Sequence, residues 1–153
     1  MLLSCNSAID DQRDFELEAQ RPASGITQTD VAGRIQEVDE DDWRIGPLFV
    51  GLIEVFNPAF PNPTSNQVVR IDFNVNSFDA VDGLIIIKED ENGFRRTIYA
   101  HPESPLRTGI VTVQFQASIL DNTGIFTNAR GVHRIPIYDR LGRLITYGDI
   151  EVI

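Results

Sequence analysis

Hydrophobic and polar residues alternate along much of the chain from Leu48 to the carboxyl end. Gln67–Val75 and Ile110–Ala117 place apolar side chains at every second position, which is the pattern of a half-buried strand. Leu84–Ile87 is a continuous apolar run, as expected of a strand buried on both faces. Turn signals such as Asp90-Glu91-Asn92-Gly93 separate these runs. The pattern predicts about seven strands after Leu48 and no convincing helix there.

Short strands at this regular spacing are typical of an immunoglobulin-like fold. We therefore predict an all-β chain whose residues 47–153 form an Ig-like antiparallel β-sandwich of about seven strands. The single cysteine excludes the Cys…Trp…Cys core of an antibody-type domain but not the general architecture.

The first 46 residues differ in composition from the rest. They hold eleven acidic residues and four arginines, a net charge of −7, and include the run Asp39-Glu40-Asp41-Asp42. A segment with so few large apolar residues buries little surface, so residues 1–46 are predicted to form an extended acidic arm. The alternation from Val31 to Val38 could form one strand within it. Trp43 and Ile45 are expected to mark where this arm docks onto the body.

Charge and composition narrow the chemistry. The formal net charge of −10 and the pI of about 4.5 oppose binding to nucleic acid, whose backbone is anionic. The sequence lacks a glycine-rich phosphate loop, so no nucleotide is expected, and no apolar stretch approaches the length of a membrane-spanning helix. One cysteine and two histidines supply no recognisable catalytic or metal-ligating constellation. We predict a protein that is not an enzyme and has no cofactor.

Two further features keep alternative interpretations open. The acidic run Asp39–Asp42 could bind Ca²⁺ but lacks the spacing of a calcium loop, so a solvated charged run is preferred. Trp43 and Phe60 lie in irregular segments, among acidic residues and prolines respectively. They are either exposed anchors of an interface or hydrophobic plugs at the ends of the sandwich.

The amino end, Leu2-Leu3-Ser4-Cys5, resembles the lipobox of bacterial lipoproteins. In that family the peptide is cut before the cysteine, which becomes the acylated amino terminus. The resemblance implies lipid attachment at Cys5 and anchoring to a membrane on its non-cytoplasmic side, in the periplasm or at the cell surface. A free thiol in a polar tail is the alternative.

The body carries a second resemblance. Ala59-Phe60-Pro61-Asn62-Pro63-Thr64-Ser65 and Ile137-Tyr138-Asp139-Arg140-Leu141-Gly142-Arg143 are similar to segments of the β-sandwich sorting domains of Bacteroidota secreted proteins. In those domains the second segment lies mid-domain, whereas here it lies within sixteen residues of the carboxyl end. The resemblance therefore implies the sandwich fold and not secretion as a function.

Together these features favour a lipid-anchored envelope protein that acts as an accessory subunit of a larger membrane complex. Respiratory complexes of Bacteroidota-like bacteria, alternative complex III included, carry small lipoprotein subunits and are one candidate partner by analogy. The alternatives are a free-standing module that binds a surface ligand such as carbohydrate, and a subunit of a surface fibre or layer. In the fibre, the last strand, 148–153, would pair with a neighbouring chain.

Overall fold

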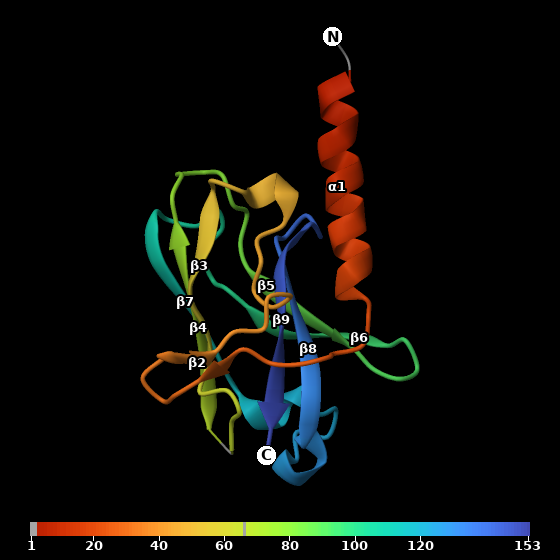
Figure 1. Cartoon of the computed structure of the whole chain (residues 1–153), viewed down its shortest axis with the longest axis vertical. Coiled ribbons are helices and arrows are strands. Elements are labelled where there is room, and N and C mark those ends of the chain that lie inside the picture. Colours follow the sequence, from red (N-terminus) through yellow and green to blue (C-terminus); the bar gives the residue numbers. More distant parts are fainter. Residues whose placement is uncertain (1–2, 66) are drawn as a thin grey trace.

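The computed structural model describes residues 3–65 and 67–153, with the backbone alone for residues 3–6. Two antiparallel sheets lie face to face (Figure 1). One has the order β3-β4-β7 and the other the order β6-β5-β8-β9. Their strands are β3 (Ile53–Phe60), β4 (Val68–Val75), β5 (Ile85–Glu89), β6 (Arg95–Ala100), β7 (Gly109–Gln116), β8 (Gly131–Tyr138) and β9 (Leu144–Val152). The prediction of a mostly-β chain built from antiparallel sheets is confirmed.

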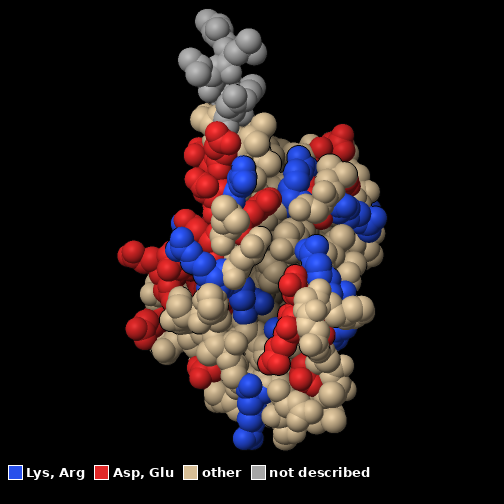
Figure 2. Space-filling model, turned by 90° about the vertical axis from the view of Figure 1, so that its right-hand side faces the viewer, with Lys and Arg blue, Asp and Glu red and all other residues tan. Residues whose placement is uncertain are grey.

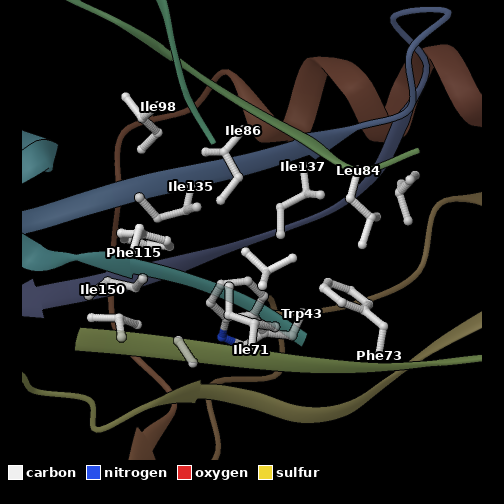
Figure 3. Packing of buried hydrophobic residues seen from close by; sticks show 14 of the residues in the cluster. Trp43, Ile71, Phe73, Leu84, Ile86, Ile98, Phe115, Ile135, Ile137 and Ile150 are labelled. Carbon is white, nitrogen blue, oxygen red and sulfur yellow. The ribbon is translucent and has the colours of Figure 1, made fainter. Parts of the chain in front are cut away.

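The alternation in the sequence places the core between the two sheets. On β4, Ile71 and Phe73 are fully buried, and they face buried isoleucines of the other sheet such as Ile86 on β5 and Ile137 on β8 (Figure 3). Burying each such side chain stabilises the fold by about 1.5–3 kcal/mol. Three short 3-10 turns complete the body, namely η1 (Pro47–Phe49), η2 (Ala117–Leu120) and η3 (Phe126–Ala129).

The expected extended arm is in part a helix, α1 (Leu3–Ala19). Its second half, residues 11–19, is rich in the good helix formers Gln, Arg, Glu, Leu and Ala, and Pro22, whose ring opposes helix, follows its end. The helix packs on the sandwich through a single aromatic side chain, Phe15, whose ring centre lies 5.2 Å from that of Tyr147. Among the described side chains of α1, Phe15 and Ala19 alone add to this apolar cluster, so the helix has no hydrophobic stripe that the pattern could reveal.

Residues 20–46 are extended and run across the sandwich (Figure 1). They contain a small antiparallel hairpin of β1 (Gln28–Thr29) and β2 (Ile35–Glu37). The alternation noted in the sequence thus produces a strand only three residues long, and its side chains are exposed. Because these residues contact the body, residues 20–46 are not a free tether.

The open edge of β9 is covered by the chain itself. The amides of Trp43 and Gly46 donate to the carbonyls of Tyr147 and Ile145, each at 2.7 Å. Further along, the amide of Thr64 donates to the carbonyl of Glu151 at 2.8 Å. Strand edges left unpaired invite association with other chains, so these bonds protect the carboxyl-terminal strand.

Trp43 fixes the point where the arm meets the core. Its backbone has a positive φ of 61°, which is rare for a bulky residue, and its side chain is only 7% exposed. The indole lies directly over Gly148 of β9, so that a Cβ atom at position 148 would overlap the ring. Glycine is therefore required at position 148 by the tryptophan that covers it.

Gly148→Ala is expected to lower the free energy of unfolding by about 1–3 kcal/mol, since overpacking forces the indole and its backbone to move. Urea unfolding followed by circular dichroism, a signal that does not depend on the tryptophan, would measure the loss. The control is the same substitution in a Trp43→Ala background, where the Cβ atom meets empty space. Equal costs in both backgrounds would contradict the proposed contact.

Candidate functional site

The three residues that the sequence singles out do not meet in one place. Cys5 belongs to the first turns of α1, but its side chain lies outside the described residues. Trp43 lies at the end of the arm, and Phe60 lies at the end of β3. No common site joins the three.

Trp43 and Phe60 are not exposed anchors. Each is 7% exposed, and Trp43 belongs to the main core between the sheets (Figure 3). The ring of Phe60 packs beneath Gly33 of the β1–β2 hairpin and lies 5.4 Å from the guanidinium carbon of Arg70. The prediction of exposed interface anchors is corrected to the alternative of buried plugs. The indole of Trp43 enters the core between the sheets, and the β1–β2 hairpin of the arm covers the ring of Phe60.

A buried polar cluster joins the arm to β8 and β9. Asp149 on β9 accepts two hydrogen bonds from the guanidinium of Arg134 on β8, at 2.8 and 2.9 Å. Asp42 of the arm accepts a hydrogen bond from the amide of Asp149 at 2.9 Å and another from the amide of Thr27 at 2.8 Å. The Ser24 amide also donates to Asp149, at 3.1 Å. The carboxylates therefore take the place of the missing strand partners along this edge.

Asn62 completes this cluster from the loop after β3. Its amide group donates to the carbonyls of Thr27 and Asp149, each at 2.9 Å. Its side-chain oxygen accepts from the Glu151 amide at 3.0 Å. Being fully buried and fully bonded, Asn62 fixes the arm, the loop and β9 in one arrangement.

Asp42 is a buried acid with a raised pKa, a property that the sequence did not reveal. The run Asp39–Asp42 was expected to be solvated, yet Asp42 is only 8% exposed. Burial is the largest cause that raises the pKa of Asp42 from 3.8 to about 7, and the nearby Asp149 carboxylate adds to it. Bonds from backbone amides oppose this shift without cancelling it. The sequence pattern cannot distinguish this aspartate from its exposed neighbours.

A groove of about 640 Å³ lies on the outer face of the four-stranded sheet. Strands β5, β6 and β8 form its floor, and the residues after α1 form one wall. Apolar side chains on the floor include Ile87, Val132 and Pro136. Val132 is 44% exposed, so the groove offers apolar surface that the chain leaves uncovered.

The lining of this groove has a charge opposite to that of the whole protein. Four basic side chains, Arg21, Lys88, Arg95 and Arg134, line it with one acidic side chain, Glu89. Figure 2 shows basic side chains around the middle of this face, with acidic side chains among them. Against a net charge of −10, such a lining attracts carboxylates.

The basic side chains of the groove differ in how strongly they are already paired with acidic groups of the chain. Arg134 is already paired with Asp149, whereas the Arg95 guanidinium is 3.9 Å from Glu89 and lies 5.9 Å from the Tyr138 ring centre. Burial is the largest cause that lowers the pKa of Lys88, followed by the neighbouring Arg96. The exposed guanidinium of Arg95 is thus the cation best placed to meet a ligand in the groove.

Over the part of the chain that the structure describes, no helix is long and apolar enough to cross a bilayer. Within the same residues, His, Cys, Asp and Glu side chains nowhere gather in threes that could hold a metal ion. Comparison with protein-family models, with curated proteins and with solved structures finds no match. The docked arm, α1 and the groove are therefore the features from which a function can be inferred.

The raised pKa of Asp42 predicts a pH dependence of stability. Between pH 3.8 and about 7 the folded chain keeps a proton on Asp42 that the unfolded chain has lost. The free energy of unfolding should therefore fall as pH rises through this range, by up to about 1.4 kcal/mol per pH unit from this group. Urea unfolding at several pH values between 4 and 8 would measure the slope.

Asp42→Asn is the control for this slope, since the amide carries no charge at any pH in this range. Both histidines, whose pKa values burial lowers, remain in the variant. The difference between the two stability curves therefore isolates Asp42. Parallel curves for wild type and Asp42→Asn would contradict its assignment.

Proposed function

We propose that this chain is a non-enzymatic, lipid-anchored envelope protein that acts as an accessory subunit of a larger membrane complex. The observation that carries the proposal is the placement of α1. It packs on the body at Gln12 and Phe15, and its first turns project past the sandwich (Figure 1). An acyl chain on Cys5 would thus stand clear of the folded body, where a bilayer can receive it.

The groove supplies the partner-binding surface in this proposal. Its apolar floor favours burial against another protein, and its basic rim favours a partner segment that carries carboxylates. The wall formed by residues 19–23 is held in place by Arg134, whose guanidinium donates to the carbonyls of Glu18 and Arg21 at 3.3 and 2.9 Å. Because this wall is fixed before binding, a partner would lose little conformational entropy to it.

The order of the strands supports an Ig-like assignment of the body. In the immunoglobulin constant-type sandwich, the first, second, fifth and fourth strands form one sheet and the others form the second. Numbered from β3, the chain has its first, second and fifth strands in one sheet. It differs by the position of the fourth strand, β6, which joins the other sheet. We propose an Ig-like sandwich in which the fourth strand, β6, belongs to the second sheet and not to the first.

The two alternative functions have less support. A carbohydrate module would gather exposed aromatic side chains at one end, whereas Phe78 follows β4 and Phe94 belongs to the turn between β5 and β6, which projects from the side of the body (Figure 1). A fibre subunit joined through β9 would need the edge that Trp43, Gly46 and Thr64 already cover. The respiratory partner suggested by the lipobox resemblance remains one member of the proposed class of complexes.

Membrane attachment is tested by replacing Cys5. Native fractionation of membranes solubilised in mild detergent, followed by mass spectrometry, should show the wild-type chain migrating with a complex several times its 17.1 kDa mass. Cys5→Ser should move the chain to the soluble fraction, because the bilayer attachment is lost. Recovery of the wild type in the soluble fraction would overturn the anchor, and migration as a small lipidated species would overturn the subunit assignment.

Partner binding is tested in the groove. Val132→Asp places a carboxylate on the apolar floor and is expected to reduce recovery in the complex by at least about tenfold, as when a buried contact of 1.4 kcal/mol or more is lost. Val68→Asp is the matched control, since Val68 is a strand valine that is 41% exposed on the other sheet, against 44% for Val132. Equal effects of the two variants would exclude the groove as the binding surface.

A further inference from the structure

One end of the sandwich, which we call the anchor end, is made of the connections that lie toward the projecting turns of α1. Its segments are residues 47–52, 76–84, 101–109 and 139–143. The anchor end is the upper end of the body in Figure 1, and the carboxyl terminus lies at the opposite end. Any surface that receives the amino end of the helix therefore approaches this end first.

Three exposed apolar side chains lie on separate connections of the anchor end. Val50 is 69% exposed, Phe78 is 75% exposed and Leu141 is 68% exposed. None of them is needed for the core, which is closed beneath them by buried side chains such as Phe49 and Val81. Apolar side chains on separate loops form no pocket for a small ligand. They can contact a broad, deformable apolar surface such as a lipid bilayer.

The connections that carry these tips are bonded to one another. Backbone amides donate from Asn76 to Leu52, from Arg140 to Asp82 and from Leu106 to Val81, at 2.7 to 2.9 Å. The guanidinium of Arg143 lies 5.4 Å from the ring centre of Phe49, which ties the β8–β9 turn to η1. The apolar tips therefore belong to one continuous surface.

Charge at the anchor end is nearly balanced. Its four segments hold four acidic residues and three arginines, a net of −1 in a chain of −10. Asp139 pairs with Arg143 at 2.7 Å, and Glu103 pairs with Arg107 at 3.3 Å. Repulsion between these four segments and anionic headgroups is accordingly weak, and the projecting part of α1 adds the acidic residues Asp10 and Asp11.

The helix sets how far Cys5, the proposed site of lipid attachment, lies from the anchor end of the sandwich. Gln12 donates to the carbonyl of Leu144 at 2.9 Å and accepts from the amide of Leu48 at 3.2 Å, so it lies level with the base of the anchor end. Cys5 is seven residues earlier, which places it about 10 Å further along the helix axis. The polar layer on each side of a bilayer is roughly 5–8 Å thick. A residue held at the hydrocarbon boundary would bring the loop tips to the headgroups.

From this geometry we infer that the anchor end contacts the lipid bilayer surface through Val50, Phe78 and Leu141. The inference rests on the proposed lipid attachment at Cys5 and adds to it a defined orientation of the body. With the anchor end on the lipid, the groove stands to the side, open to a neighbouring protein in the same membrane. The end that carries Ile125 and the carboxyl terminus points away from the bilayer, and the turn between β5 and β6 with Phe94 projects from the side of the body (Figure 1).

The test uses the full chain coupled through its only thiol, Cys5, to a maleimide phospholipid in phosphatidylcholine vesicles. Hydrogen exchange measured by mass spectrometry compares this sample with the same chain in solution, its thiol capped by a soluble maleimide. We expect slower exchange on the vesicles in residues 47–52, 76–84 and 139–143, and unchanged exchange in residues 90–94 and 121–130.

Two sets of substitutions separate lipid contact from attachment alone. Val50→Ser, Phe78→Ser and Leu141→Ser together should abolish the slower exchange at the anchor end. Phe94→Ser, Ile125→Ser and Ile153→Ser together are the matched control and should leave it unchanged, since these exposed side chains lie away from the anchor end. Unchanged emission from Trp43 would show that both variants are folded.

Two outcomes would overturn the inference. Exchange that is the same on vesicles and in solution would mean that the body hangs free of the lipid. Slower exchange confined to residues 87–95 and 132–138 would mean that the groove faces the bilayer instead. Because the lipid is attached chemically, either result is independent of whether Cys5 is acylated in the cell, which the fractionation experiment decides separately.

Discussion

The buried carboxylates of Asp42 and Asp149 are the constraint on which the arrangement of this chain depends. Strand β9 ends its sheet, and residues 20–46 have no hydrophobic stripe of their own to dock with. The two carboxylates accept hydrogen bonds from the backbone amides of Ser24 and Thr27 in the arm and of Asp149 on β9. The guanidinium of Arg134 compensates the charge of Asp149. The network converts a polar arm into a covering for a strand edge.

This solution leaves Asp42 without a cation bonded to it, so its proton carries part of the stability of the docked arm. The cluster also explains why Trp43 can occupy the core with a positive φ. Neighbouring residues hold the backbone on either side, and burial of the indole offsets the strain. Electrostatics and packing thus act on the same few residues of the arm.

The docked arm also decides what the outer face of the four-stranded sheet presents. Helix α1 covers Leu144 and Tyr147, and the residues after it form a wall beside β8. The rest of the face is left as a groove with an apolar floor and a basic rim. An acidic protein that concentrates arginine around one apolar groove favours partners with the opposite charge there, and its acidic arm disfavours them elsewhere.

The period-two alternation on β4 and β7 was sufficient to predict buried strands, because each position on a strand faces either the core or its outer side. Composition likewise separated the first 46 residues from the body. The sequence could not show that α1 is a helix, because Phe15 is the one large apolar side chain among its described residues that packs on the sandwich and its other contacts are polar. Nor could it show which acid of the run Asp39–Asp42 is buried, that Trp43 enters the core, or that Phe60 lies beneath the β1–β2 hairpin. Local pattern determined the strands, whereas contacts between residues more than a hundred positions apart, such as Asp42 and Asp149, decided where the arm lies and what surface it leaves open.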